Sequence, residues 1–98
     1  MANILIADSG STKAEWCLIN GEKKKKFFTQ GISPYFLNTN EIEQLLATEL
    51  KRKLKDNEPD EIHYYGTGCA NPENVKSVTR ALTATFPKAK INVTHDLR

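Results

Sequence analysis

The sequence predicts an α/β domain built on a mixed sheet of five strands, with elements in the order β-β-β-α-β-α-β. Three observations support this prediction. Short apolar runs bounded by turn residues occur together with two longer segments of helical periodicity. An Asn-Gly dipeptide at residues 20–21 joins two strand-like runs as a hairpin. Each of the last two strand-like runs follows a helical segment. This order is typical of right-handed strand-helix-strand units with parallel strands.

The first third of the chain is expected to form the antiparallel part of the sheet. Residues 4–7 are continuously apolar, which is typical of a central strand covered on both faces. Turn-forming residues 8–12 separate them from a second strand over about residues 13–19. Asn20-Gly21 fits a two-residue turn with positive φ, and a third strand returns over about residues 24–29.

Two helices and two further strands are expected after residue 37. Asn38, followed by Glu41 three residues on, is typical of a capping box at a helix start. Apolar residues then recur at helical spacing at Ile42, Leu45, Leu46, Leu50 and Leu54. Asn71-Pro72 opens the second helix, because proline suits the first helical position. Its apolar stripe comprises Val75, Val78, Leu82 and Phe86, and the strands are expected at residues 61–65 and 91–94.

This arrangement predicts a ribonuclease H-like domain with strand order 3-2-1-4-5, in which strand 2 is antiparallel. In open sheets of this kind, ligands bind beyond the carboxyl ends of the parallel strands. Asp8, residues 66–68 and Asp96 all follow the ends of predicted parallel strands. We therefore expect these residues to line one site.

Composition argues against several classes of protein. The chain has 98 residues, of which 39% are hydrophobic and 27% charged, as is ordinary for a globular domain. No apolar run approaches the roughly 18 residues that span a bilayer, and nothing like a signal peptide precedes the first strand, so we expect a cytoplasmic protein. Cys17 and Cys69 lack the spacing of a disulfide framework or a zinc site.

Charge gives no sign of a nucleic-acid surface. The formal net charge is only +2, and the lysines at 23–26 adjoin the predicted Asn-Gly turn without interleaved aromatic residues. A solvated hairpin explains this run better than a nucleic-acid patch. We expect neither nucleic acid nor a membrane as a partner.

The turn at residues 8–13 is suited to binding a phosphate. Gly10 leaves room for a phosphate to approach main-chain N–H groups, and the hydroxyls of Ser11 and Thr12 add donors. Asp8 would repel a phosphate, so its natural role is to hold Mg²⁺ against the phosphate oxygens. An ordinary polar hairpin turn remains an alternative reading of the same residues.

Residues 4–13 (ILIADSGSTK) resemble the first phosphate motif of the N-acetylglucosamine kinase and BadF/BadG-type ATPase family, which belongs to the actin and sugar kinase superfamily. The resemblance continues through residues 31–34, 65–69 and 92–96 and so covers essentially the whole chain. It implies that residues 1–98 form part of the N-terminal lobe of a two-lobed actin-like ATPase, with the second lobe absent from this sequence.

The resemblance also implies a reaction and its residues. The parent protein would transfer the γ-phosphoryl group of ATP, with Mg²⁺, to a hydroxyl of an amino sugar such as N-acetylglucosamine, and Asp96 would be the catalytic aspartate. The nucleotide site would comprise Asp8, Gly10, Ser11, Thr12 and Lys13, with Asp8 at the metal. The sugar site would comprise Ser33, Pro34, Tyr35, Gly66, Thr67 and Gly68. The isolated fragment is expected to be inactive, and the parent protein is a candidate homodimer.

Two other functions stay open on the sequence alone. A BadF/BadG-type ATPase would use ATP hydrolysis to activate a partner enzyme through an iron–sulfur cluster, for which Cys17 and Cys69 lack the expected spacing. A non-enzymatic ribonuclease H-like module would bind a phosphate-bearing ligand or a protein partner.

Overall fold

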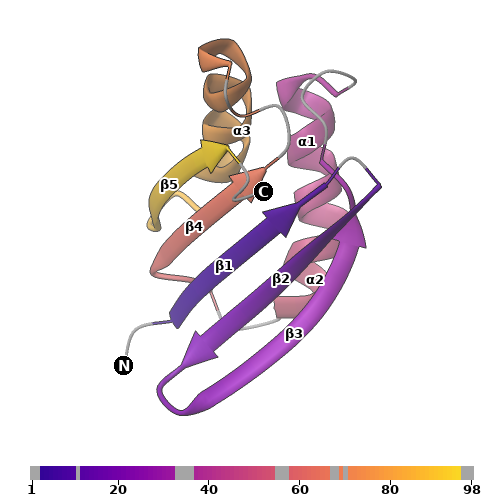
Figure 1. The fold of residues 1–98 in the computed structure, drawn as a ribbon. Helices are drawn as coiled ribbons and strands as arrows, with labels where there is room; N and C mark the ends of the chain where they lie inside the picture. The colour runs from indigo at the N-terminus through magenta and orange to yellow at the C-terminus, as the bar shows by residue number, and fades with distance from the viewer. Residues whose placement is uncertain are drawn as a thin grey trace.

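A five-stranded sheet in the order β3-β2-β1-β4-β5 forms the centre of the molecule (Figure 1). The computed structural model describes residues 3–10, 12–32, 37–54, 58–66, 69 and 71–95. The strands are β1 (Asn3–Ser9), β2 (Lys13–Asn20), β3 (Lys23–Gln30), β4 (Glu61–Gly66) and β5 (Lys90–His95). β2 is antiparallel to both of its neighbours, whereas β1, β4 and β5 are parallel. The predicted fold class and strand order are thus confirmed.

Strand β1 is longer than its sequence suggests. Asp8 and Ser9, which the sequence assigns to a turn, continue the strand. They pair with Glu15 and Ala14 of β2 on one side and with β4 on the other. Two ladders of backbone hydrogen bonds therefore outweigh the local turn preference of these polar residues.

The first helical segment follows the predicted capping box. The Asn38 side chain accepts a hydrogen bond from the Glu41 N–H at 2.8 Å, and the Glu41 carboxylate accepts one from the Asn38 N–H at 3.0 Å. Helix α1 (Thr39–Leu45) continues directly into a π-helical turn, η1 (Leu46–Leu50), and then into α2 (Lys51–Leu54). The sequence did not predict the π-helical turn.

The leucine spacing explains this turn. Positions 42, 46, 50 and 54 are apolar at every fourth residue, and in a regular α-helix such a stripe rotates away from the core by about 40° at each step. A wider π-helical turn reduces the rotation. It keeps Leu46 and Leu50 completely buried and Leu54 almost so.

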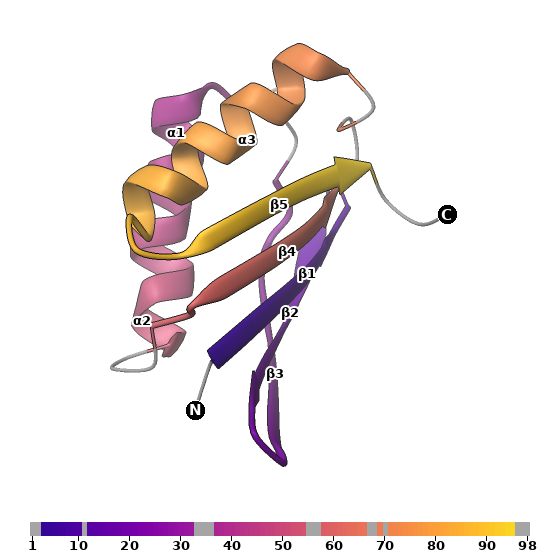
Figure 2. The same ribbon diagram turned by 90° about the vertical axis from the view of Figure 1, so that its left-hand side faces the viewer.

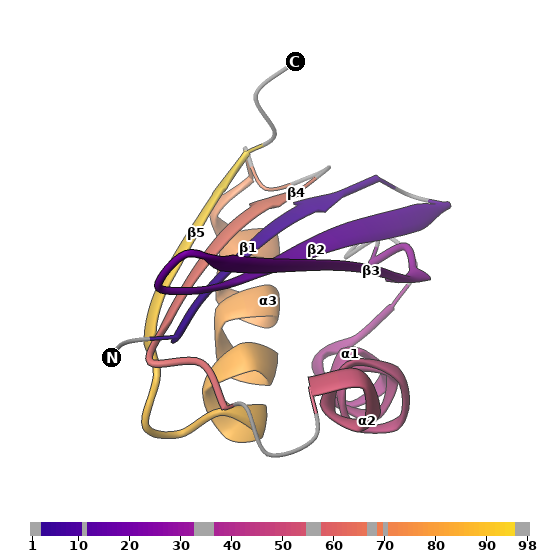
Figure 3. The same cartoon turned by 90° about the horizontal axis from the view of Figure 1, so that it is seen from below.

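Both helical segments cover the same face of the sheet (Figures 2 and 3). The second one, α3 (Pro72–Thr85), starts at Asn71, whose side chain accepts a hydrogen bond from the Glu73 N–H at 2.9 Å. Trp16 and Tyr64 are at the centre of the core, with ring centroids 6.1 Å apart. Other fully buried core residues include Leu5, Ile42, Leu46, Ile62, Val78 and Leu82.

The opposite face of the sheet has no helix among the described residues. Leu5 and Ala7 of β1 are fully buried against the helices, but Ile4 and Ile6 are only partly buried on the other side. The expectation that residues 4–7 are covered on both faces therefore holds for one face only. No helix within the described part of the chain is long and apolar enough to cross a membrane.

Candidate functional site

The parallel strands β1, β4 and β5 end in one row at one edge of the sheet. Ser9 is in register with Gly66, and Gly66 is in register with His95. The turn between β1 and β2 lies at this same edge (Figure 1), because Ser9 also pairs with Ala14 at the start of β2. Asp8 and Gly66 thus lie on neighbouring strands at the edge where the sequence predicts a ligand.

A hollow of about 450 Å³ opens beside this turn on the face that the helices leave open. Its lining residues are Asp8, Gly10, Thr12, Lys13, Glu15 and Phe28. Four of the predicted nucleotide-site residues therefore share one concave surface. It presents two carboxylates, one ammonium group and one hydroxyl, a set of groups that suits a metal–phosphate ligand.

Two residues of the hollow, Glu15 and Phe28, were not predicted. Glu15 is the direct cross-strand partner of Asp8, and Phe28 is the partner of Glu15 on the next strand. Phe28 is 47% exposed, and the Lys13 ammonium lies 5.5 Å from its ring centroid. Strand alternation from Lys13, combined with the register set by the Asn20-Gly21 turn, could have placed both residues on this face.

The turn itself is closed by its own backbone. The Gly10 N–H donates to the Lys13 carbonyl at 3.0 Å, and the Gly31 N–H donates to the Thr12 carbonyl at 3.0 Å. The Gly10 N–H is therefore already paired and is not the donor that a phosphate would use. The Thr12 hydroxyl and the Lys13 ammonium remain as polar groups that face solvent at this turn.

The fold does not require glycine at position 10. A Cβ atom built there would lie 3.5 Å from the Lys13 carbonyl oxygen, which is ordinary van der Waals contact, and the backbone φ is not positive. At Gly66 the reverse holds, since a Cβ atom would lie 2.3 Å from the Tyr64 ring. Gly66 is therefore explained by packing, whereas room for a ligand is the remaining explanation for Gly10.

Several predicted site residues lie outside the described residues. They are Ser11, Ser33, Pro34, Tyr35, Thr67, Gly68 and Asp96. The strands and segments that precede them are described. Ile32 leads to residues 33–35, Gly66 ends β4 before residues 67–68, and β5 ends in the same row immediately before Asp96.

The two cysteines belong to different surroundings. Cys69 is buried in the core, where burial raises the pKa of its thiol to about 11, whereas Cys17 is half-buried on the open face of the sheet.

Within the described residues, no group of three or more histidine, cysteine, aspartate or glutamate side chains could hold a metal ion. A metal at this turn would therefore depend on the Asp8 and Glu15 carboxylates together with ligand oxygens.

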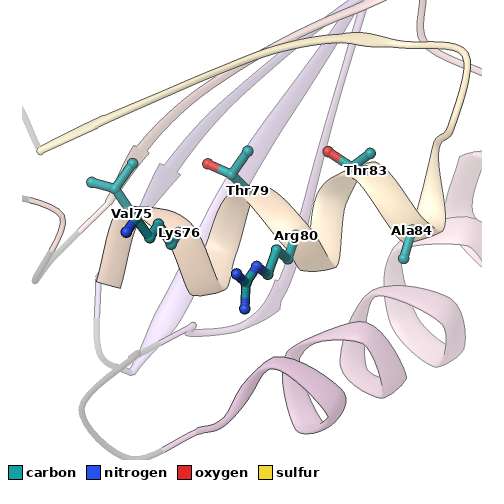
Figure 4. Close-up of a pocket in the computed structure, with 6 residues that line it drawn as sticks. All are labelled: Val75, Lys76, Thr79, Arg80, Thr83 and Ala84. Carbon is teal, nitrogen blue, oxygen red and sulfur yellow. The ribbon is translucent and has the colours of Figure 1, made fainter. Parts of the chain in front are cut away.

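A second concave surface lies along α3 (Figure 4). It measures about 550 Å³ and is lined by Val75, Lys76, Thr79, Arg80, Thr83 and Ala84. Every lining residue comes from this one helix, so among the described residues no group from another element converges on this open surface.

Comparison with known proteins supports the fold and a kinase-like relationship. No protein-family model and no curated protein match the chain. A solved structure from Porphyromonas gingivalis, described as a candidate N-acetylglucosamine kinase, is 34% identical with a TM-score of 0.87, over 96% of this chain and 34% of that one. RuvC of T. thermophilus in complex with a Holliday junction is 12% identical with a TM-score of 0.52, over 97% of this chain and 65% of that one.

These matches define the class of fold. The RuvC match shows the ribonuclease H-like fold alone, because its sequence identity is low. The match to the P. gingivalis protein shows that this chain has the kinase-like form of that fold. The chain spans about a third of the length of the P. gingivalis protein.

Proposed function

We propose that this chain supplies the phosphate-binding part of an ATP-dependent sugar kinase, in which residues 1–98 form part of the N-terminal lobe. The observation that carries the proposal is the hollow beside the β1–β2 turn, where Asp8, Gly10, Thr12 and Lys13 meet at the carboxyl end of β1. The similarity to the P. gingivalis candidate kinase supports phosphotransfer as the reaction. The activity belongs to the longer parent protein, because one lobe provides only one side of a cleft.

The charges in the hollow imply that the nucleotide enters together with Mg²⁺. Asp8 and Glu15 bring two carboxylates to a surface with one ammonium group, Lys13, so ATP without a cation would be repelled. The Thr12 hydroxyl and Lys13 would bind the terminal phosphates, while Asp8 would hold Mg²⁺, directly or through water. The ion would neutralise charge on the phosphates during transfer.

The acceptor sugar would lie across the same edge of the sheet. Residues 33–35 follow Ile32, residues 66–68 leave the end of β4, and Asp96 follows the end of β5. Of the elements that precede these segments, β4 and β5 end in the row formed by Ser9, Gly66 and His95. Asp96 would accept the proton of the attacking sugar hydroxyl, in a reaction that depends mainly on positioning.

A coupled kinase assay of the full-length parent with MgATP and a panel of amino sugars tests this function. We expect turnover of at least one sugar, and Asp96→Asn should abolish it while changing the Kd for MgATP by less than about twofold. Glu22→Gln, in the exposed turn at the other end of β2, is the matched control and should keep full activity. No turnover of any sugar, or full turnover by Asp96→Asn, would sink the proposal.

The iron–sulfur ATPase alternative receives less support. Cys17 and Cys69 are the only cysteines of the chain, and they lie on different faces of the sheet, one partly exposed and one in the core. Two thiols so arranged are not placed to share one cluster.

A further inference from the structure

Ser9 lies between two residues of the hollow, Asp8 and Gly10, but its side chain faces the other way. Successive side chains of a strand point to opposite faces. Asp8 is partly buried on the open face, whereas Ser9 is 0% exposed and faces the helices. A buried hydroxyl in this position requires hydrogen-bond partners.

The Ser9 hydroxyl finds its partners on the chain that leaves β3. Its oxygen accepts a hydrogen bond from the Ile32 N–H at 3.0 Å, and the hydroxyl lies 3.4 Å from the Ile32 carbonyl oxygen and 3.3 Å from that of Gly10. Ile32 is itself fully buried. Next to this contact, the Gly31 N–H donates a hydrogen bond to the Thr12 carbonyl. Two neighbouring hydrogen bonds thus join residues 31–32 to the turn at residues 8–13, which we call the phosphate turn.

Ser9 also lies against the end of β4. The hydroxyl of Tyr64 is buried, and within the described residues it has no hydrogen bond of good geometry. Burial raises the pKa of Tyr64, and the adjacent Ser9 hydroxyl opposes part of that rise. The Tyr64 ring in turn packs directly under Gly66. One hydroxyl therefore contacts or adjoins three segments that meet at the carboxyl edge of the sheet.

We propose that Ser9 is a positioning residue that couples the phosphate turn to the chain entering residues 33–35. This inference rests on the proposed function, in which the turn holds the phosphates and residues 33–35 contact the acceptor. A fixed distance between these segments matters, because small displacements of reacting groups cost large factors in rate. In this role Ser9 touches neither ligand and acts through the backbone of Ile32.

A purely structural role for Ser9 makes a different prediction. A buried hydroxyl that only stabilises the fold would, when removed, lower the stability without changing how Ile32 responds to a ligand at the turn. If Ser9 couples the two segments, its removal should leave the response of the turn to the ligand and abolish the response of Ile32. The test must therefore follow the turn and Ile32 in the same experiment.

Amide NMR spectra of the full-length parent titrated with MgATP provide this test. In the wild type we expect the amides of Gly10 and Thr12 to shift together with that of Ile32. In Ser9→Ala the turn amides should still shift, while the Ile32 response is lost. Ser9→Thr, which keeps the hydroxyl, should restore the Ile32 response.

The control is Thr85→Ala, which removes another buried hydroxyl, one that donates to the Ala81 carbonyl within α3 at 2.8 Å. It should leave all three amide responses at wild-type size. If Ser9→Ala does not fold, Ser9→Cys takes its place, since a thiol of similar volume is a weak acceptor.

The possible outcomes separate the two proposals. Equal Ile32 responses in the wild type and in Ser9→Ala, with the turn amides still shifting, would overturn the positioning role alone. Absence of any MgATP response at Gly10 and Thr12 in the wild type would contradict the proposed function, and the positioning role would fall with it.

Discussion

Strand β2 is flanked by two tight turns that differ in their surroundings. The turn before β2 is connected to the rest of the fold through the Gly31–Thr12 and Ile32–Ser9 hydrogen bonds. The turn after β2, at Gly21 and Glu22, is exposed. Among the described residues it makes no hydrogen bond to another element.

The presence of glycine has a different explanation in each turn. Gly21 has φ of 62°, a left-handed conformation that favours glycine, so its presence is explained by the backbone alone. Gly10 has neither a positive φ nor a crowded Cβ position. A turn whose glycine the fold does not require, at an edge where three parallel strands end, has the properties of a ligand site. The other turn has those of a chain reversal.

The largest expected effect on stability is at Gly66, which lies at the same edge of the sheet as the turn between β1 and β2. Gly66→Ala would place a methyl group 2.3 Å from the buried Tyr64 ring, so the free energy of unfolding should fall by about 1–3 kcal/mol. Urea unfolding of the two chains measures this change. Gly10→Ala is the matched control, and its unfolding free energy should stay within about 0.5 kcal/mol of the wild type. A Gly66→Ala chain as stable as the wild type would contradict the packing.

A smaller effect is expected at the exposed turn. Gly21→Ala forces a Cβ atom into the left-handed conformation, so stability should fall by about 1 kcal/mol. Binding of MgATP should be unchanged, because this turn lies at the other end of β2 from the hollow. If Gly21→Ala weakened MgATP binding, the two turns would not differ as described.

The smallest effect is a loss of stability at alkaline pH. Burial raises the pKa of Cys69 from 9.0 to about 11, so the folded state holds the thiol proton more tightly than the unfolded state does. The resulting stability is complete below about pH 9 and is lost as pH rises toward about 11. By pH 9.5 the loss should be about 1 kcal/mol or less.

Urea unfolding at pH 8 and at pH 9.5 measures this loss, and Cys69→Ala should remove most of it. Tyr64, whose pKa burial also raises, adds a similar loss only above its ordinary value of 10.0. An unchanged pH dependence in Cys69→Ala would show that another group titrates in this range.

Local signals made much of the fold predictable. The capping box at Asn38 and Glu41 fixed the start of the first helical segment, and the Asn20-Gly21 dipeptide fixed the hairpin. The two strand-helix-strand connections indicated a mixed sheet with parallel strands, and the order of elements matched a ribonuclease H-like domain, whose strand order the structure has. Each of these signals involves residues close together in the sequence.

The features that could not be predicted depend on contacts between distant segments. Glu15 and Phe28 enter the hollow only through the pairing register of three strands. The part played by Ser9 depends on Ile32, which lies 23 residues further along the chain. A serine within a predicted phosphate motif carries no local signal that its side chain faces the core.

The central claim is that residues 8–13 bind the phosphates of a nucleotide together with Mg²⁺. Amide chemical-shift mapping of the full-length parent with ATP, in the presence and absence of Mg²⁺, tests it most directly. We predict Mg²⁺-dependent shifts concentrated at Asp8, Gly10, Thr12, Lys13 and Glu15, with none at Gly21 or Glu22. Shifts of equal size at both turns, or shifts that do not depend on Mg²⁺, would contradict the claim.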